Sequence, residues 1–441
     1  MKYIVVLVVC CFLFAAPSSA QTVFHNEWID YGKTYYKIKV SGDAQLFRIT
    51  KEVLDAHGLP TVGTGLQLWH RGQEVPMYVS TLGTFENNDY IEFYGKGNDG
   101  EFDTQLYRYS SWQPSTYKSL FADTAAYYLV ADNSSAHLRY QNVPNEITGA
   151  LEPEAFFYYE SRKVNANQFF GGKPAPIGGE SVNFSNFEDG EGWVSTTINE
   201  DDDKNYNVNT EYAYENAGDA TVNMKVIGRS NQLVLNPDHH LVVSVNGMAY
   251  VDTLYEGYVT KLFSFDLPIG TLGTPNTTVN VACPLDLPGG IVNKNVVPYI
   301  NITYPRMFNF DGNYSFEFEL ANDCDKLIEI TNFNGGAAPV LYDLSNHLRL
   351  LPIEVDNGGE IVYQFKLDML TDGPNTRRLF FTNTSNTGGL YQTVTLVNSL
   401  EEVQFTDFSL SENQGDYIIL SHPLLMQGEV NQVERYYNYR K

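Results

Sequence analysis

The sequence predicts an all-β chain, built from tandem β-sandwich domains and ending in the first strand and helix of an α/β domain. Apolar and polar residues alternate along most of the chain, as in Tyr36, Ile38 and Val40, and this period of two is typical of half-buried strands. Tyr and Phe number 31 and 26, while charged residues make up only 18%. That balance favours strands, because aromatic side chains lose freedom in helices and pack well on pleated sheets.

Turn-rich gaps divide the 441 residues into segments of domain size. We expect a signal peptide at 1–20, a β-rich domain at 21–149, a jelly-roll-like sandwich at 150–310, an Ig-like sandwich at 311–410, and the truncated start of an α/β domain at 411–441. No pattern recurs with a period of about 20 to 50 residues, which argues against solenoids and propellers.

The first twenty residues have the features of an export signal. Lys2 is the only charge before an apolar run that ends at Ala16, and small residues follow, so we expect cleavage after Ala20. The run is too short to cross a bilayer as a helix. Because no later segment is long and apolar enough, we expect an exported chain without a transmembrane segment.

Two local signals define elements inside the β domains. Thr50 can cap a short helix that contains Leu54 and stops at Gly58. Further along, Asn246 and Gly247 separate two alternating apolar runs. Since this pair tolerates positive φ at both central positions of a type I′ turn, we expect a β-hairpin there.

The last segment predicts a different architecture. Residues 417–420 form a continuous apolar run, a turn follows at 421–423, and a helical pattern begins after Gly428. A strand buried on both faces needs neighbours that the few remaining residues cannot supply. We therefore expect 411–441 to be the opening of a truncated α/β domain. The alternative is a terminal strand that docks on the preceding sandwich.

Charge and cysteine content limit the partners and the chemistry. The net charge of −25 argues against nucleic acid and anionic membranes, because both attract basic surfaces. Outside the signal segment only Cys283 and Cys324 remain. They could pair in an oxidising compartment or stay as two separate thiols, and the sequence leaves both options open. Neither has a local signature of a catalytic thiol.

One acidic stretch has the start of a calcium-binding loop. Asp201, Asp203 and Asn205 alternate as the first ligands of such a loop do. However, Tyr206 and Tyr212 occupy the positions that require glycine and glutamate. We interpret the stretch as a solvated acidic loop.

Three further candidates for chemistry are better explained as structural residues. The glycine-rich segment 95–100 follows a strand but opens no helix, so it is a turn and not a phosphate loop. His239 and His240 lack acidic or Cys ligands at metal spacing. His422 follows the apolar run but has no partner, and we interpret it as a turn residue before Pro423. We assign no catalytic, cofactor-binding or metal-binding residue, and we expect no cofactor.

Several segments in order resemble the front end of gingipain-like cysteine peptidases, and especially the sortase of the bacterial type IX secretion system and its secreted relatives. The matching segments are 28–38 (WIDYGKTYYKI), 68–76 (LWHRGQEVP), 89–95 (DYIEFYG), 302–306 (ITYPR) and 416–423 (DYIILSHP). They span almost the whole chain after the signal segment, and none is a catalytic motif.

The resemblance implies β-sandwich domains ahead of a caspase-like α/β peptidase domain. In that family the catalytic His and Cys lie downstream of the strand that matches 416–423, so neither can be assigned here, and whether this chain is itself an enzyme stays open. The family's activity is acyl transfer through a Cys thiolate, in which a sortase cleaves carboxyl-terminal signals from cargo. The resemblance also implies a cell-surface, outer-membrane or extracellular location in a Gram-negative bacterium, with secreted cargo proteins and outer-membrane secretion components as partners.

A second hypothesis is a surface β-sandwich module that binds carbohydrate or protein, or mediates adhesion, without catalysis. Exposed Tyr side chains and Trp193 in the jelly-roll-like domain would then stack on sugar rings. Packing of these aromatic residues within the sheets is the alternative. An exposed aromatic row on one face of the sandwich would favour binding.

Overall fold

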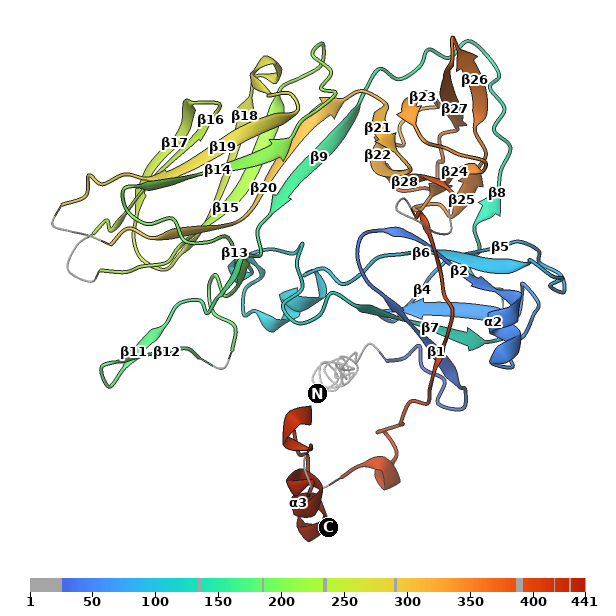
Figure 1. Cartoon of the computed structure of the whole chain (residues 1–441), viewed down its shortest axis with the longest axis horizontal. Helices are drawn as coiled ribbons and strands as arrows, with labels where there is room; N and C mark the ends of the chain where they lie inside the picture. The colour runs from blue at the N-terminus through green and yellow to red at the C-terminus, as the bar shows by residue number, and fades with distance from the viewer. Residues whose placement is uncertain are drawn as a thin grey trace, which may run out of the picture.

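The computed structural model describes residues 26–441, apart from 134–135, 185, 233–235, 289–291, 386–391, 416, 428–429 and 441. The expected signal peptide lies outside the described residues. The described chain is almost entirely β, with strands arranged in several sheets, so the predicted all-β class is confirmed (Figure 1).

Unit 1 is a sandwich of two sheets, with strand orders β30-β1-β7-β3-β4 and β29-β2-β6-β5. Helix α2 (Lys51–Ala56) begins after Thr50 and ends before Gly58, which has a φ of +64°, so the expected helix is confirmed. The Thr50 side chain makes no capping hydrogen bond, which differs from the expected cap. The strands are β1 Tyr35–Val40, β2 Gln45–Thr50, β3 Leu66–His70, β4 Gln73–Glu74, β5 Met77–Val79, β6 Tyr90–Gly95, β7 Ala125–Ala131, β29 Val394–Leu396 and β30 Glu401–Val403; the 3-10 helices are η1 Phe102–Leu106 and η2 Ser110–Trp112.

Unit 2 is a sandwich of two four-stranded sheets, with orders β14-β19-β16-β17 and β18-β15-β20-β9. Asn246 and Gly247 have φ values of 46° and 86° and join β16 to β17, which confirms the expected hairpin. The elements are β9 Phe157–Val164, β10 Gln168–Phe170, β11 Ala175–Ile177, β12 Glu180–Val182, β13 Gly192–Val194, β14 Asp202–Asn209, β15 Ala220–Gly228, β16 His239–Val245, β17 Met248–Tyr255, β18 Thr260–Leu267, η3 Ile269–Thr271, β19 Asn276–Cys283 and β20 Asn295–Arg306.

Unit 3 packs the sheet β21-β23-β27-β26 against the sheet β22-β28-β24-β25-β8 around a core rich in phenylalanine. The strands are β8 Gln141–Asn142, β21 Asn309–Asn313, β22 Ser315–Ala321, β23 Lys326–Phe333, β24 Pro339–Asp343, β25 Leu348–Leu350, β26 Ile353–Asn357, β27 Glu360–Leu367 and β28 Thr376–Asn383.

Units 1 and 3 exchange strands. β8 leaves unit 1 before unit 2 begins and pairs in parallel with β25 of unit 3. After unit 3 the chain returns, so that β29 pairs with β2 and β30 pairs with β1. Strand pairing therefore crosses the positions near 149 and 310 where turn-rich gaps had suggested boundaries. Unit 2 is inserted between two units that are tied to each other.

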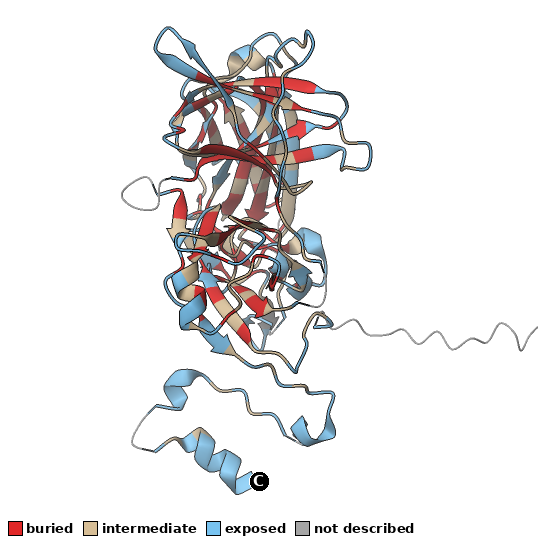
Figure 2. Ribbon diagram, turned by 90° about the vertical axis from the view of Figure 1, so that its right-hand side faces the viewer, coloured by how far each residue is buried: buried red, intermediate tan, exposed pale blue. Residues whose placement is uncertain are grey.

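The segment that follows β30 and Phe405 extends away from the three units and is mostly exposed (Figures 1 and 2). It contains η4 Ser411–Asn413, η5 Pro423–Leu425 and α3 Gln432–Arg440. The expected helix is present as α3, but residues 417–420 form no strand, because a strand needs a hydrogen-bonded neighbour and none lies beside this run. Among the described residues, no helix has the length and apolar character needed to cross a membrane.

Candidate functional site

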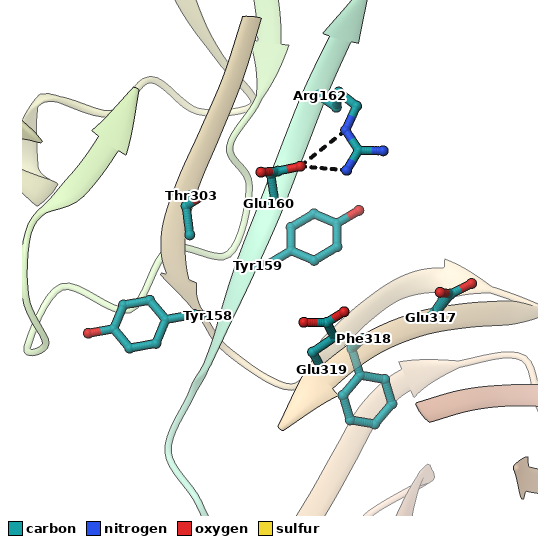
Figure 3. Close-up of a pocket in the computed structure, with 8 residues that line it drawn as sticks. All are labelled: Tyr158, Tyr159, Glu160, Arg162, Thr303, Glu317, Phe318 and Glu319. Carbon is teal, nitrogen blue, oxygen red and sulfur yellow. Dashed lines mark hydrogen bonds and ion pairs between the residues drawn. The ribbon is translucent and has the colours of Figure 1, made fainter. Parts of the chain in front are cut away.

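Two hollows lie side by side where the three units meet. The first measures about 460 Å³ and lies between units 2 and 3 (Figure 3). It is lined by Tyr158, Tyr159, Glu160, Arg162, Thr303, Glu317, Phe318 and Glu319. These residues come from β9 and β20 of unit 2 and from β22 of unit 3. Both β9 and β22 are edge strands of their sheets, and the first hollow lies along these two edges, which approach each other where their aromatic rings pack.

Aromatic side chains form the floor between the two edges. Tyr159 of β9 lies 5.5 Å from Phe316 of β22, measured between ring centroids. Phe157 lies 5.4 Å from Phe318 in the same way. The buried guanidinium of Arg306 stands 5.2 Å from the centroid of Tyr159 and 5.3 Å from that of Phe316. These contacts join units 2 and 3 at the base of the hollow.

The second hollow, of about 450 Å³, adds unit 1 to the site. It shares Arg162, Glu317 and Glu319 with the first hollow, so the two adjoin. We call the combined site the junction groove. Its remaining lining residues are His70, Arg71, Tyr94, Lys96, Gly97, Asp99, Glu101, Thr116, Tyr117, Tyr127 and Arg378.

Arg162 joins unit 2 to unit 1 within the groove. Its guanidinium lies 3.8 Å from the ring centroid of Tyr117, and its Nε donates to Glu160 Oε1 at 3.1 Å. The Tyr117 hydroxyl in turn accepts a hydrogen bond of 2.7 Å from Asn301 Nδ2 of β20. A cation over an aromatic face is favourable even when it is partly solvated, so this stack orients the Arg162 side chain.

Tyr94, Glu317 and Arg378 connect unit 1 to unit 3 at the other wall. The Tyr94 hydroxyl donates to Glu317 Oε2 at 2.5 Å and accepts from Arg378 Nη2 at 2.6 Å, and Arg378 also donates to Glu317. Burial and the adjacent Glu317 carboxylate raise the pKa of Tyr94 far above its usual range. Burial opposes the charge of Arg378, but Glu317 and Tyr94 outweigh it and raise the pKa of that guanidinium.

The glycine-rich segment 95–100 supplies part of the wall from unit 1. Asp99 pairs with Lys96 at 3.2 Å and with Arg71 at 3.7 Å. A Cβ atom on Gly97 would come within 2.6 Å of the Asp123 carbonyl oxygen, so close backbone packing requires glycine there. The sequence predicted a turn here, but Gly95 ends β6, residues 96–99 are irregular, and Gly97 and Gly100 do not have positive φ. Nothing local in the sequence indicated that this segment would line a groove.

The charges of the groove leave an excess of carboxylates. Among the described residues, each cation of the lining has an acidic partner: Arg71 and Lys96 have Asp99, Arg162 has Glu160, and Arg378 has Glu317. No ion pair within the described part of the chain involves Glu101 or Glu319. The groove therefore attracts positive charge.

The two cysteines are separate thiols, so the disulfide alternative does not apply. Cys283 is buried in unit 2, where burial raises its pKa to about 11 in spite of a hydrogen bond from Asn295. Cys324 is exposed in unit 3 and contacts Lys326 Nζ at 3.5 Å. A thiol with a raised pKa is a poor nucleophile, and neither thiol lies in the junction groove.

The histidine pair has partners that sequence spacing did not indicate. His239 is buried and bonds Asn293 and the Ser230 carbonyl. His240 lies between two carboxylates, with Nδ1 2.8 Å from Asp286 and Nε2 2.9 Å from Asp252. These acids are 46 and 12 residues away in sequence, which is why local spacing missed them.

The other sequence candidates lie apart from the groove. Asp203 and Asn205 bond the side chain of Asn280 on the neighbouring strand. His422 accepts a hydrogen bond of 3.2 Å from the Leu424 amide and so caps η5, as a turn residue would. Within the described ranges, no group of three or more His, Cys, Asp or Glu side chains could hold a metal ion.

Comparison with known proteins gives structural likeness only. No protein-family model and no curated protein matches the chain. Dimeric latent PorU from Porphyromonas gingivalis is similar with a TM-score of 0.48 and 11% identity, over 80% of this chain and 32% of that chain. The present chain thus spans about a third of the PorU length.

Two carbohydrate-binding modules are also similar in structure. The CBM36-1 domain of a xylanase from the hindgut metagenome of Trinervitermes trinervoides has a TM-score of 0.19 and 13% identity, over 33% of this chain and 95% of that one. Tandem CBM51 modules of a family 98 glycoside hydrolase from Streptococcus pneumoniae have a TM-score of 0.18 and 11% identity, over 61% and 78%. At such values function must be argued from the residues of this chain itself.

Proposed function

We propose that this chain is the N-terminal, non-catalytic part of an exported gingipain-like cysteine peptidase of the type IX secretion sortase kind. The basis is the ordered set of sequence segments from 28–38 to 416–423 that resemble this family. On this proposal the protein is exported to the surface of a Gram-negative bacterium. Its β units position a peptidase domain and contact secreted cargo or secretion components.

The uncovered apolar run at 417–420, beyond β30, is the structural observation that carries this proposal. Ile418 and Leu420 are 83% and 94% exposed, although they belong to four consecutive apolar residues. Such a run is typical of a strand that is buried on both faces of a parallel sheet. In a peptidase of this kind, neighbouring strands of an α/β domain would cover it.

The proposal also explains why no catalytic constellation was found in the described residues. Cys283 is buried with a raised pKa, and Cys324 has no histidine among its hydrogen-bond or ion-pair partners. The nucleophile and its base would belong to the α/β domain. We therefore expect the 441-residue chain to lack peptidase activity.

Sequencing the gene beyond the codon for Lys441 is the direct test. The proposal requires an open reading frame with several strand–helix units, and with a His and a Cys at strand ends. A stop codon immediately after Lys441 would overturn it. If the frame continues, peptidase assays of the longer protein and of its Cys→Ala variant should differ, while the 441-residue chain should match the variant.

A second candidate function is a surface binding module without catalysis. The expected sugar-stacking row is not supported, because Trp193 is half-buried and packs edge-on against Phe169 across β10 and β13. The junction groove is the observation that favours binding instead. It has the volume of a ligand site, and three units contribute to its walls.

A further inference from the structure

The edge strand β9 has backbone groups that point away from its paired neighbour. The Asn165 amide donates to the Pro298 carbonyl at 2.8 Å, which sets the hydrogen-bonding register between β9 and β20. In an antiparallel ladder, alternate residues bond the neighbour and the others point outward. Tyr158, Glu160 and Arg162 therefore direct their N–H and C=O groups to the free edge.

The edge strand β22 of unit 3 has the same property on the opposite wall. The Asn322 amide donates to the Asn375 carbonyl at 2.8 Å, and the Asn383 amide donates to the Tyr314 carbonyl at 3.1 Å. These bonds place the even-numbered residues of β22 toward β28. Glu317 and Glu319 consequently point their backbone groups outward.

The hollow meets both strands along these edges. Successive side chains of a strand point to opposite faces, so a surface over one face would be lined by every second residue. The hollow is instead lined by three consecutive residues of β9, from Tyr158 to Glu160, and by three of β22, from Glu317 to Glu319. Among the described residues, no hydrogen bond reaches the outward backbone groups of either strand.

We infer that the junction groove binds an extended basic peptide, which adds as a strand to the free edge of β9. Main-chain hydrogen bonds from an added strand provide affinity, and side-chain contacts provide selectivity. This inference depends on the two strand edges and on the groove charges. It holds whether or not the chain belongs to a peptidase.

The charge of the groove selects a basic peptide. Glu319 stands on the wall opposite β9 without a cation partner, and Glu101 extends the same excess toward unit 1. The whole chain carries a formal charge of −25, so its long-range field also favours a cation. Lys or Arg side chains of the peptide complement these carboxylates.

The two faces of an added strand would meet different surroundings. Side chains on one face would contact the half-buried ring of Tyr159, which packs above the buried core of unit 3. Those on the other face would lie among Glu160, Glu319 and solvent. The expected ligand therefore alternates apolar and basic residues over a few positions.

The test uses a displayed library of random twelve-residue peptides, selected against the 441-residue protein without its first twenty residues. The variant Glu160→Pro removes one outward N–H from the free edge of β9. Proline is tolerated there because that N–H takes no part in the ladder to β20. We expect enriched peptides rich in Lys and Arg, and about tenfold weaker binding to this variant.

The matched control is Ser264→Pro on β18, the opposite edge strand of the same sheet. The Gly228 amide donates to the Val259 carbonyl at 3.0 Å, so Ser264 also points its N–H outward, but it lies away from the groove. Ser264→Pro should bind the enriched peptides as the unmodified protein does. The variant Glu319→Gln should weaken binding by about two- to fivefold and lower its salt dependence.

Hydrogen exchange gives a measurement that needs no variant. The amides of Tyr158, Glu160 and Arg162 should exchange more slowly when the enriched peptide is added, while that of Ser264 should not change. Three results would each overturn the inference. The first is that no peptide binds the unmodified protein more tightly than the Glu160→Pro variant. The second is that the enriched peptides are acidic, and the third is that added peptide leaves amide hydrogen exchange along β9 unchanged. A failure here leaves the peptidase proposal untouched, because gene sequencing tests that separately.

Discussion

Unit 1 contacts unit 3 through a different kind of interface from the one that unit 2 forms with either of them. Units 1 and 3 share a buried apolar cluster that includes Leu46 and Phe380. A buried carboxylate also bridges them: Glu92 accepts from Arg48 Nε at 2.9 Å and from the Tyr342 hydroxyl at 2.7 Å. Strand exchange through β8, β29 and β30 completes a closed interface.

Unit 2 meets unit 1 through polar contacts, and it meets unit 3 through the packed rings of Phe157 and Tyr159 beside an open groove. Lys225 donates to the Gln113 carbonyl at 2.7 Å, and Asn301 donates to Tyr117 at 2.7 Å. The nearby pair of Glu160 and Arg162 is solvent-exposed. Strand pairing closes the interface between units 1 and 3, whereas unit 2 packs aromatic rings on unit 3 and leaves strand edges and charges beside them open to a ligand.

Removing the buried carboxylate should have the largest effect. The Glu92 side chain is 1% exposed and that of Arg48 is 14% exposed, so Glu92→Ala leaves a charge without its partner in the interface. We expect the free energy of unfolding to fall by about 3–5 kcal/mol, measured by urea denaturation. The control Glu160→Ala breaks an exposed pair and should cost at most about 1 kcal/mol. Equal losses in both variants would contradict the distinction between the two interfaces.

Removing one hydroxyl from the same network should have a smaller effect. Tyr342→Phe takes away the hydrogen bond of 2.7 Å to Glu92 while it keeps the buried ring. A loss of about 1–3 kcal/mol is expected, because the accepting oxygen is buried and charged. Tyr158→Phe at the groove changes a ring that is 56% exposed and should be neutral in the same denaturation experiment. A neutral Tyr342→Phe would mean that water replaces the lost donor.

An exposed ion pair within unit 2 should respond to pH. Partial burial lowers the pKa of His240, but hydrogen bonds to Asp286 and Asp252 outweigh it, so the pKa is raised. Because the pKa of His240 is raised in the folded state, its contacts with the two carboxylates stabilise the folded protein fully below the pKa of the unfolded chain, about 6.5. This contribution is lost as the pH rises through the pKa of the folded state.

His240→Gln should therefore lower the melting temperature below about pH 6 and have little effect above about pH 9. The loss should stay under about 1 kcal/mol, because both carboxylates are largely exposed. Calorimetry over this pH range measures it. A melting-temperature difference between the two proteins that grows with pH would show that the pKa of His240 is lowered and not raised.

The two cysteines should differ in their reactivity toward a thiol reagent, and replacing the exposed one should have almost no effect on stability. Cys324 should react with a thiol reagent in the native protein, and Cys283 only after unfolding, because it is buried with a pKa of about 11. Cys324→Ser should change the free energy of unfolding by less than about 0.5 kcal/mol. Rapid labelling of Cys283 in the folded protein would mean that unit 2 opens locally.

Most of the local structure could be predicted from the sequence. Alternation identified strands such as β1, Asn246 with Gly247 identified a hairpin, and Thr50 with Gly58 bounded α2, because periodicity and turn chemistry involve neighbouring residues. All of these depend on a few consecutive positions.

The candidate site could not be predicted in this way. The junction groove brings together residues as distant as Lys96, Arg162 and Arg378, and His240 meets an acid 46 positions away. The apolar run at 417–420 has the composition of a strand, but a strand also needs a neighbour to pair with, and the run itself does not predict one. The spacing of residues along the sequence does not predict which strands become the edges of a sheet.

Local sequence patterns are enough to predict an all-β chain with a hairpin at Asn246–Gly247 and a short helix in the first unit. Long-range packing sets the exchange of strands between units 1 and 3, and it makes β9 and β22 sheet edges that line one groove. The physical reason is that strand formation follows from local side-chain alternation, whereas strand pairing depends on long-range packing and on the closure of the intervening chain.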